Sequence, residues 1–202
     1  MKNSFYEELP GIYRLRVPFE NLYTSVFLLV GENGAYLVDC ATTREDVEEY
    51  ILPALGELGY TPDSLCGLVL THGHGDHAGG LPHILGHAPR LEVIRDEREL
   101  LPGVYTYPLP GHTVDCIGVL DTRTGTLISG DGLQGAGVDK YRCFTEDRAA
   151  YVETLERIKA DARIENVLFS HAYEPWNGDR AEGSEAVLSC LEACFDGLPR
   201  IE

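Results

Sequence analysis

Three histidines and an aspartate fall within one stretch of six residues, His72-Gly73-His74-Gly75-Asp76-His77. The stretch follows residues 67–70, an apolar run that predicts a short buried strand. The intervening glycines allow tight turns, so four side chains able to ligate a metal can converge on one centre. The chain must therefore fold so that a buried strand ends in this loop, where α/β folds usually place functional groups. Imidazole and carboxylate ligands favour zinc, iron or manganese over copper or calcium.

Four side chains are too few to hold two metal ions, so other parts of the chain should supply further ligands. Three candidates each follow a predicted extended segment: His112, Asp131 and His171. His83 and His87 are four residues apart, near or within the helix expected after Asp76. We expect these two to be exposed helical histidines rather than ligands.

Strand-like and helix-like segments alternate along the chain. Strands are predicted at residues 22–30, 35–39, 67–70, 91–94, 116–120, 126–128 and 166–169, with tight turns at Asn33-Gly34 and near Thr124-Gly125. Helices are predicted after Thr43, with a disturbance at Pro53, at residues 147–160 behind Thr145, and over the apolar stripe within residues 187–195. This alternation predicts an α/β fold with helices outside sheet, in one domain over residues 1–202.

Taken together, these motifs resemble the metallo-β-lactamase-fold hydrolase superfamily. The motifs that carry the resemblance span residues 37–171 and are Leu37-Val38-Asp39, Thr71-His72-x-His74-x-Asp76-His77, Gly111-His112-Thr113, Gly130-Asp131 and Ser170-His171. The resemblance implies a four-layer αββα sandwich of two mixed β-sheets flanked by helices. Residues 114–116 depart from the family's pattern after Gly-His-Thr, which alters the turn behind His112.

The resemblance also implies a binuclear site for two divalent ions, with zinc first and iron or manganese as alternatives. The implied ligands are His72, His74 and His112 for one ion, Asp76, His77 and His171 for the other, and Asp131 as the bridge. Asp39 is expected to orient the ligand loop. Two ions that share a hydroxide would make the chain a hydrolase of a small ester, thioester or lactone, and Asp76 would orient the nucleophile or take its proton.

Within the superfamily, the chain is similar to the hydroxyacylglutathione hydrolase (glyoxalase II) group or to lactonases. Asp131 argues against true β-lactamases, and His74 argues against flavodiiron oxidoreductases. Three alternatives stay open: a mononuclear iron sulfur dioxygenase, a phosphodiesterase of the same fold, and a non-catalytic metal-binding or sensor protein.

A short basic and aromatic segment, Lys140-Tyr141-Arg142, follows Asp131 by about ten residues. In glyoxalase II-like enzymes a Lys and a Tyr at a similar place hold the substrate, although here they are adjacent rather than separated. We expect Lys140, Tyr141 and Arg142 to bind an anionic group on the substrate, remote from the scissile bond.

The acidic balance of the chain restricts its partners. Its 16 basic and 33 acidic side chains give a net charge of −17. This charge repels phosphate backbones and anionic membranes, so we expect a small-molecule substrate and neither nucleic acid nor a membrane. No apolar run approaches the about 20 residues of a spanning helix, and the N-terminus lacks the apolar core of a signal peptide, so a cytoplasmic location is expected. The six cysteines form no CxxC pair and are expected to be reduced thiols, and the sequence does not indicate an oligomeric state.

Overall fold

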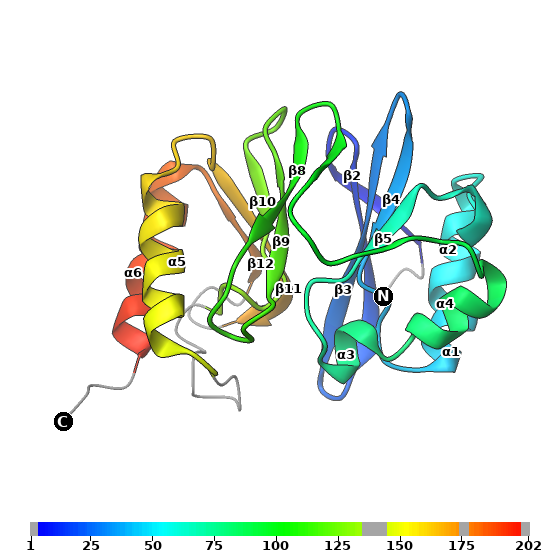
Figure 1. Cartoon of the computed structure of the whole chain (residues 1–202), viewed down its shortest axis with the longest axis horizontal. Helices are drawn as coiled ribbons and strands as arrows, with labels where there is room; N and C mark the ends of the chain where they lie inside the picture. The colour runs from blue at the N-terminus through cyan, green and yellow to red at the C-terminus, as the bar shows by residue number, and fades with distance from the viewer. Residues whose placement is uncertain (1–3, 135–144, 174–177, 199–202) are drawn as a thin grey trace. The chain divides into compact units, whose positions relative to one another are not determined.

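The computed structural model of the chain describes residues 4–134, 145–173 and 178–198. It contains two compact units, Met1–Arg95 and Asp96–Glu202, each with a six-stranded sheet and its own helices (Figure 1). The expectation of one domain over residues 1–202 stays a prediction.

The first unit contains a mixed sheet whose strand order follows the chain, β1-β2-β3-β4-β5-β6. Neighbouring strands are antiparallel from β1 to β4 and parallel from β4 to β6. The strands are β1 (Tyr6–Leu9), β2 (Ile12–Phe19), β3 (Leu22–Gly31), β4 (Gly34–Val38), β5 (Gly67–Val69) and β6 (Val93–Ile94). The expected tight hairpin joins β3 to β4, where Gly31 pairs with Gly34. β5 ends just before the ligand loop, as the sequence predicts.

The first helix of the first unit starts after Thr43, the predicted N-cap. They are α1 (Arg44–Asp46), the π-helix η1 (Val47–Ile51), α2 (Leu52–Glu57), the 3₁₀-helix η2 (Pro62–Ser64), α3 (Gly75–Ala78) and α4 (Leu81–His87). The Thr43 side chain accepts from the Asp46 amide, and the Asp46 carboxylate accepts from the Thr43 amide at 2.8 Å. The helix is disturbed near Pro53, as expected, because the π-helical turn η1 precedes it. Pro53 itself lies in the first turn of α2, where a missing N–H is tolerated. Buried side chains of η1 and α2, such as Ile51 and Leu55, join those of the strands in one core.

The second unit contains another mixed sheet, in the order β12-β11-β10-β9-β8-β7. Its strands are β7 (Glu99–Leu101), β8 (Val104–Pro108), β9 (Ile117–Asp121), β10 (Thr126–Ile128), β11 (Asn166–Tyr173) and β12 (Gly178–Glu182). β10 and β11 are parallel, whereas the other neighbours are antiparallel. The turn predicted near Thr124-Gly125 joins β9 to β10, and Gly125 has a φ of 64°.

Two long helices, α5 (Arg148–Ala160) and α6 (Ser184–Gly197), lie side by side in the second unit (Figure 1). The N-cap of α5 is Asp147 rather than Thr145, because the Asp147 carboxylate accepts from the Ala150 amide and favours the positive end of the helix dipole. The predicted stripe of α6 is buried against α5, including Val187 and Leu191.

Several strands have no clear signal in the sequence. β12 consists of Gly-Asp-Arg-Ala-Glu, and in the described chain it forms one edge of its sheet, where polar side chains are accommodated. β2 contains Arg14, which is fully buried because it pairs with Glu8 at 3.1 Å and lies over the Phe27 ring. A charged residue inside a strand obscures the hydrophobic pattern on which a prediction depends.

The described cysteines Cys40, Cys66, Cys116, Cys190 and Cys194 are free thiols, as predicted, and Cys143 lies outside the described residues. Cys66 is exposed and the other four are buried. Burial raises the pKa of the Cys40 thiol, which donates to the His77 carbonyl at 3.1 Å. The hydrogen bond to Cys194 raises the pKa of Cys190, and burial raises it further.

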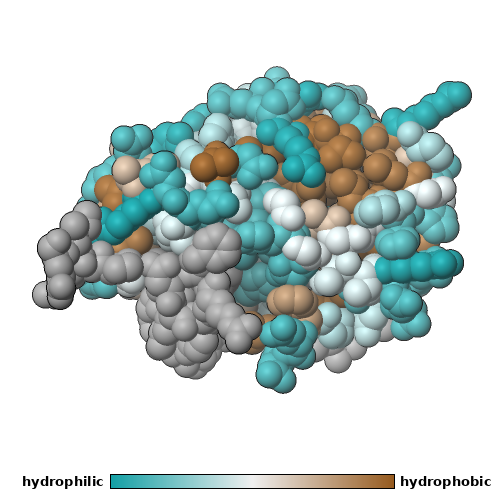
Figure 2. Space-filling view, turned by 60° about the horizontal axis from the view of Figure 1, so that its bottom comes forward, coloured by the Kyte–Doolittle hydropathy of each residue, from teal (hydrophilic) through white to brown (hydrophobic). Residues whose placement is uncertain are grey.

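Among the described helices, none combines the length and the apolarity that a membrane crossing requires. The face drawn in Figure 2 is mainly hydrophilic, with one large area of hydrophobic side chains and smaller hydrophobic patches elsewhere. The cytoplasmic location expected from the N-terminus stays a prediction.

Candidate metal centre

The first unit brings its four ligand-type side chains together between the end of β5 and α3. His72 Nε2 lies 3.0 Å from His74 Nδ1, and the rings of His72 and His77 are 4.2 Å apart. His77 Nε2 lies 3.4 Å from Asp76 Oδ2. His72 and His77 are buried, whereas Asp76 keeps 15% of its side chain exposed. The loop predicted from the sequence thus forms a compact cluster of three imidazoles and a carboxylate.

Asp39 fixes this loop from the end of β4. Its carboxylate accepts from the Thr71 amide at 2.8 Å and from the Thr71 hydroxyl at 2.9 Å, and it lies 2.7 Å from His77 Nδ1. The φ of Asp39 is 61°, a left-handed conformation that aspartate tolerates better than most residues. Because a carboxylate only accepts, it holds the proton of His77 on Nδ1 and directs Nε2 towards Asp76. These are the contacts expected of a residue that orients the ligand loop.

Two glycines directly after the loop, Gly79 and Gly80, allow it to approach the segment that follows β4. The Gly80 amide donates to the Ala41 carbonyl at 3.1 Å. A Cβ on Gly79 would lie 2.0 Å from the Thr42 carbonyl oxygen, and one on Gly80 would lie 2.0 Å from the Cys40 carbonyl oxygen. The sequence reasoning above did not single out this pair, although a Gly-Gly dipeptide beside a ligand loop signals close backbone approach.

The second unit forms a three-residue cluster from three separate segments. His112 follows β8, Asp131 follows β10, and His171 lies in β11, where the register with β12 shifts after Leu168. Asp131 Oδ2 lies 3.8 Å from His112 Nε2, and Asp131 Oδ1 lies 3.5 Å from His171 Nε2. All three residues are buried. The carboxylate therefore turns one oxygen towards each histidine, within a single unit.

The turn around His112 is fixed by α5. The Glu146 amide donates to the His112 carbonyl at 3.2 Å, and the Asp147 amide donates to the Gly111 carbonyl at 3.1 Å. Gly111 has a φ of 142°, and a Cβ there would lie 2.5 Å from Tyr151 Cα. Where the sequence departs from the family's pattern, the Val114 amide donates to the Glu146 carboxylate at 3.0 Å, just before α5.

The buried side chain of Gln134 places its Nε2 2.7 Å from His112 Nδ1. Sequence reasoning missed this residue, because glutamine has no metal-binding signature of its own.

The donor sets of both clusters suit divalent metal ions. Histidine and carboxylate are the ligands that zinc, iron and manganese accept. In each cluster a histidine has a polar partner on the ring nitrogen that faces away from the neighbouring aspartate, and metal-binding histidines usually have such a partner. That partner is Asp39 for His77 and Gln134 for His112. The residues present therefore fit a metal.

The other predicted residues divide into two groups. Lys140, Tyr141 and Arg142 lie outside the described residues. His83 and His87 both lie on α4, as expected, where His87 is exposed and His83 is half-buried.

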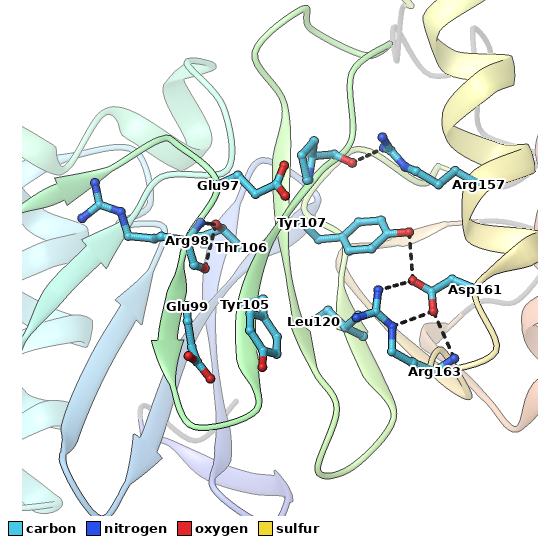
Figure 3. Close-up of a pocket in the computed structure, with 11 residues that line it drawn as sticks. Glu97, Arg98, Glu99, Tyr105, Thr106, Tyr107, Leu120, Arg157, Asp161 and Arg163 are labelled. Carbon is cyan, nitrogen blue, oxygen red and sulfur yellow. Dashed lines mark hydrogen bonds and ion pairs between the residues drawn. The ribbon is translucent and has the colours of Figure 1, made fainter.

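A cavity of about 520 Å³ opens elsewhere in the second unit, among β7, β8, β9 and the end of α5 (Figure 3). The Tyr107 hydroxyl donates to Asp161 at 3.3 Å, and the Arg157 guanidinium lies 5.3 Å from the centre of the Tyr107 ring. The Arg163 guanidinium donates two hydrogen bonds to Asp161, at 2.8 and 2.6 Å, which lower the pKa of the Asp161 carboxyl. No residue of the two clusters described above lines this cavity, and we assign it no part in the chemistry.

Comparisons with known proteins agree with this geometry. The sequence model of the metallo-beta-lactamase superfamily matches residues 20–97. The chain is 30% identical over 164 residues to a beta-lactamase-like protein 2 homolog of Drosophila melanogaster, which covers 67% of this chain and 54% of the relative. It is 29% identical over 162 residues to a hydroxyacylglutathione hydrolase of Pseudomonas fluorescens, which covers 67% of this chain and 62% of the relative. The chain thus spans about half the length of the curated relatives it matches.

Among solved structures, the DIM-1 metallo-beta-lactamase is similar to this chain with a TM-score of 0.73 and 14% sequence identity, over 96% of this chain and 97% of that one. The described chain therefore has the metallo-β-lactamase fold, as predicted from its motifs. In sequence, its residues 20–97 are similar to the metallo-β-lactamase superfamily.

Proposed function

We propose that the chain is a metal-dependent hydrolase of a small ester, thioester or lactone, with two divalent ions held by its two ligand clusters. The observation that carries the proposal is the orientation of Asp131, which turns one carboxylate oxygen towards each of two buried histidines. A carboxylate so placed suits contact with two ions at once. The proposed ligands are His72, His74 and His112 for one ion, Asp76, His77 and His171 for the other, and Asp131 for both.

Two bound divalent ions lower the pKa of a water towards neutrality and polarise the acyl oxygen of a substrate. Asp76 is the carboxylate of its cluster that solvent reaches, and its Oδ2 lies within 3.5 Å of both Thr24 Oγ1 and His77 Nε2. These contacts hold it in one orientation, in which it can orient water and accept a proton. Asp131 is more deeply buried, so we assign it to holding ions rather than to moving protons.

The likeness to a protein named hydroxyacylglutathione hydrolase favours a glutathione-type acyl compound as the first substrate to test. The net charge of −17 favours a small molecule over nucleic acid or a membrane as the partner. Binding of an anionic substrate group by Lys140, Tyr141 and Arg142 stays a prediction.

The test combines metal analysis with a substrate panel. We expect the purified chain to bind about two divalent ions and to hydrolyse a member of a panel of thioesters, lactones and phosphodiesters. His171→Ala should lose about one ion, whereas the matched control His87→Ala, on the exposed surface of α4, should keep both. One ion per chain under metal-replete conditions would contradict the binuclear site. One iron per chain with consumption of oxygen would favour the sulfur dioxygenase, and cleavage of phosphodiesters alone would favour the phosphodiesterase.

A further inference from the structure

Gln134 contacts the side of the His112 ring that faces away from Asp131. It follows Asp131 by three residues, and only 1% of its surface is exposed. Its amide nitrogen lies 2.7 Å from His112 Nδ1, a short and well-formed hydrogen-bond distance. His112 itself is 3% exposed, so this contact is shielded from solvent.

With its amide nitrogen towards the ring, Gln134 favours one tautomer of His112. An amide NH₂ group only donates, so Nδ1 must accept in this contact. A neutral imidazole then carries its proton on Nε2, which faces Asp131 at 3.8 Å. In that tautomer Nε2 has no lone pair to offer to a metal ion.

A half-turn of the Gln134 amide about its last side-chain bond exchanges its nitrogen and its oxygen. Gln134 Oε1 is buried and has no hydrogen-bond partner in the described part of the chain. After the half-turn, this oxygen would accept from Nδ1–H, and the lone pair of Nε2 would point towards Asp131. The buried oxygen would then gain a partner while the amide NH₂ takes its former place, and His112 would have the tautomer that metal binding requires.

We propose that Gln134 is a positioning residue that serves both tautomers of His112. Its amide donates to Nδ1 in the metal-free protein and accepts from Nδ1 when His112 binds an ion. Asp39 differs, because its carboxylate can only accept from His77 and holds one tautomer in both states. The inference rests on the proposed function in one respect, namely that His112 is a metal ligand.

Two variants of similar size separate the roles of the amide. Gln134→Met removes both the donor and the acceptor, whereas Gln134→Glu keeps only the acceptor. We expect Gln134→Met to weaken zinc binding about 10–100-fold in a chelator competition. We expect Gln134→Glu to restore the affinity to within a few-fold of the parent chain.

The ring ¹⁵N chemical shifts of His112 report the tautomer directly. The parent chain should show Nε2 protonated without zinc and Nδ1 protonated with zinc, and metal-free Gln134→Glu should carry its proton on Nδ1. The exposed His87 serves as an internal control, whose shifts should be the same in every variant. An unchanged zinc affinity in Gln134→Met, or one His112 tautomer in the parent chain with and without zinc, would overturn the inference.

Failure of the proposed function would give a different result. If the parent chain binds two ions and hydrolyses substrate while Gln134→Met binds zinc equally well, the inference fails and the function stands. If the parent chain binds no divalent ion, whether zinc, iron or manganese, the proposed function fails. In that case protonation of Nδ1 in the metal-free protein would still overturn the donor role of Gln134.

Discussion

The two ligand clusters are built in different ways. In the first unit, four ligand-type residues come from one stretch of six, so they are close together in the sequence before the chain folds. In the second unit, three residues come from three segments, and the pairing of strands brings them together. The parallel pairing of β10 with β11 sets Ile128 beside Leu168, which places Asp131 and His171 just beyond neighbouring strand positions.

The two clusters therefore depend on different contacts for their geometry. The first requires close contact between its loop and the segment after β4, which Gly79 and Gly80 permit. The second requires the correct register of the sheet and the contacts that hold His112 beside α5. A substitution in the loop should therefore disturb one cluster locally, whereas a shift in strand register would disperse the other.

The largest difference between the clusters should appear when Asp76 and Asp131 are each replaced by asparagine. Asp76→Asn should keep the fold and lower kcat by about 10²–10⁴-fold, because it removes both a charged ligand of one ion and a proton acceptor. Asp131→Asn should lower the amount of bound metal more strongly, because it removes an anionic ligand directed at two histidines. Metal analysis and kcat measured on the same preparations separate the two effects. Near-normal turnover by a fully metallated Asp76→Asn chain would refute its catalytic role.

The loop contact can be tested through stability. Gly80→Ala should destabilise the chain by about 1–3 kcal/mol, because its Cβ would meet the Cys40 carbonyl oxygen at 2.0 Å. Each kcal/mol corresponds to about 2–4 °C in Tm for a chain of this size. Gly86→Ala is the matched control, since its Cβ would meet nothing within 4 Å and alanine favours a helix. Equal Tm values for the two variants would show that the close contact is unimportant.

The smallest effect is expected at His83. His83→Ala should change the free energy of unfolding by less than about 0.5 kcal/mol and should leave metal content unchanged, because the residue is half-buried on α4 and belongs to neither cluster. Thermal unfolding and metal analysis check both points. Loss of an ion would mean that the first unit holds metal through α4 as well as through its loop.

The sequence predicts the first cluster almost completely, because glycine spacing and ligand type lie within one loop. It also predicts His112, Asp131 and His171, since each follows an extended segment. It does not predict Gln134 or the contacts of Gly80, because these depend on segments that meet only in the folded chain. β12 is not predicted for another reason, because its polar residues at a sheet edge give no hydrophobic alternation.

The distribution of the thiols has a practical consequence. Thiol reagents attack the thiolate of an accessible cysteine, so among the described cysteines the native protein should react first at the exposed Cys66. Cys40 is shielded in the first unit, whereas Cys116, Cys190 and Cys194 are shielded in the second. After Cys66 is blocked, the rate at which each buried thiol reacts measures how often its own unit opens. The buried cysteines of each unit can thus report the opening of that unit without any added label.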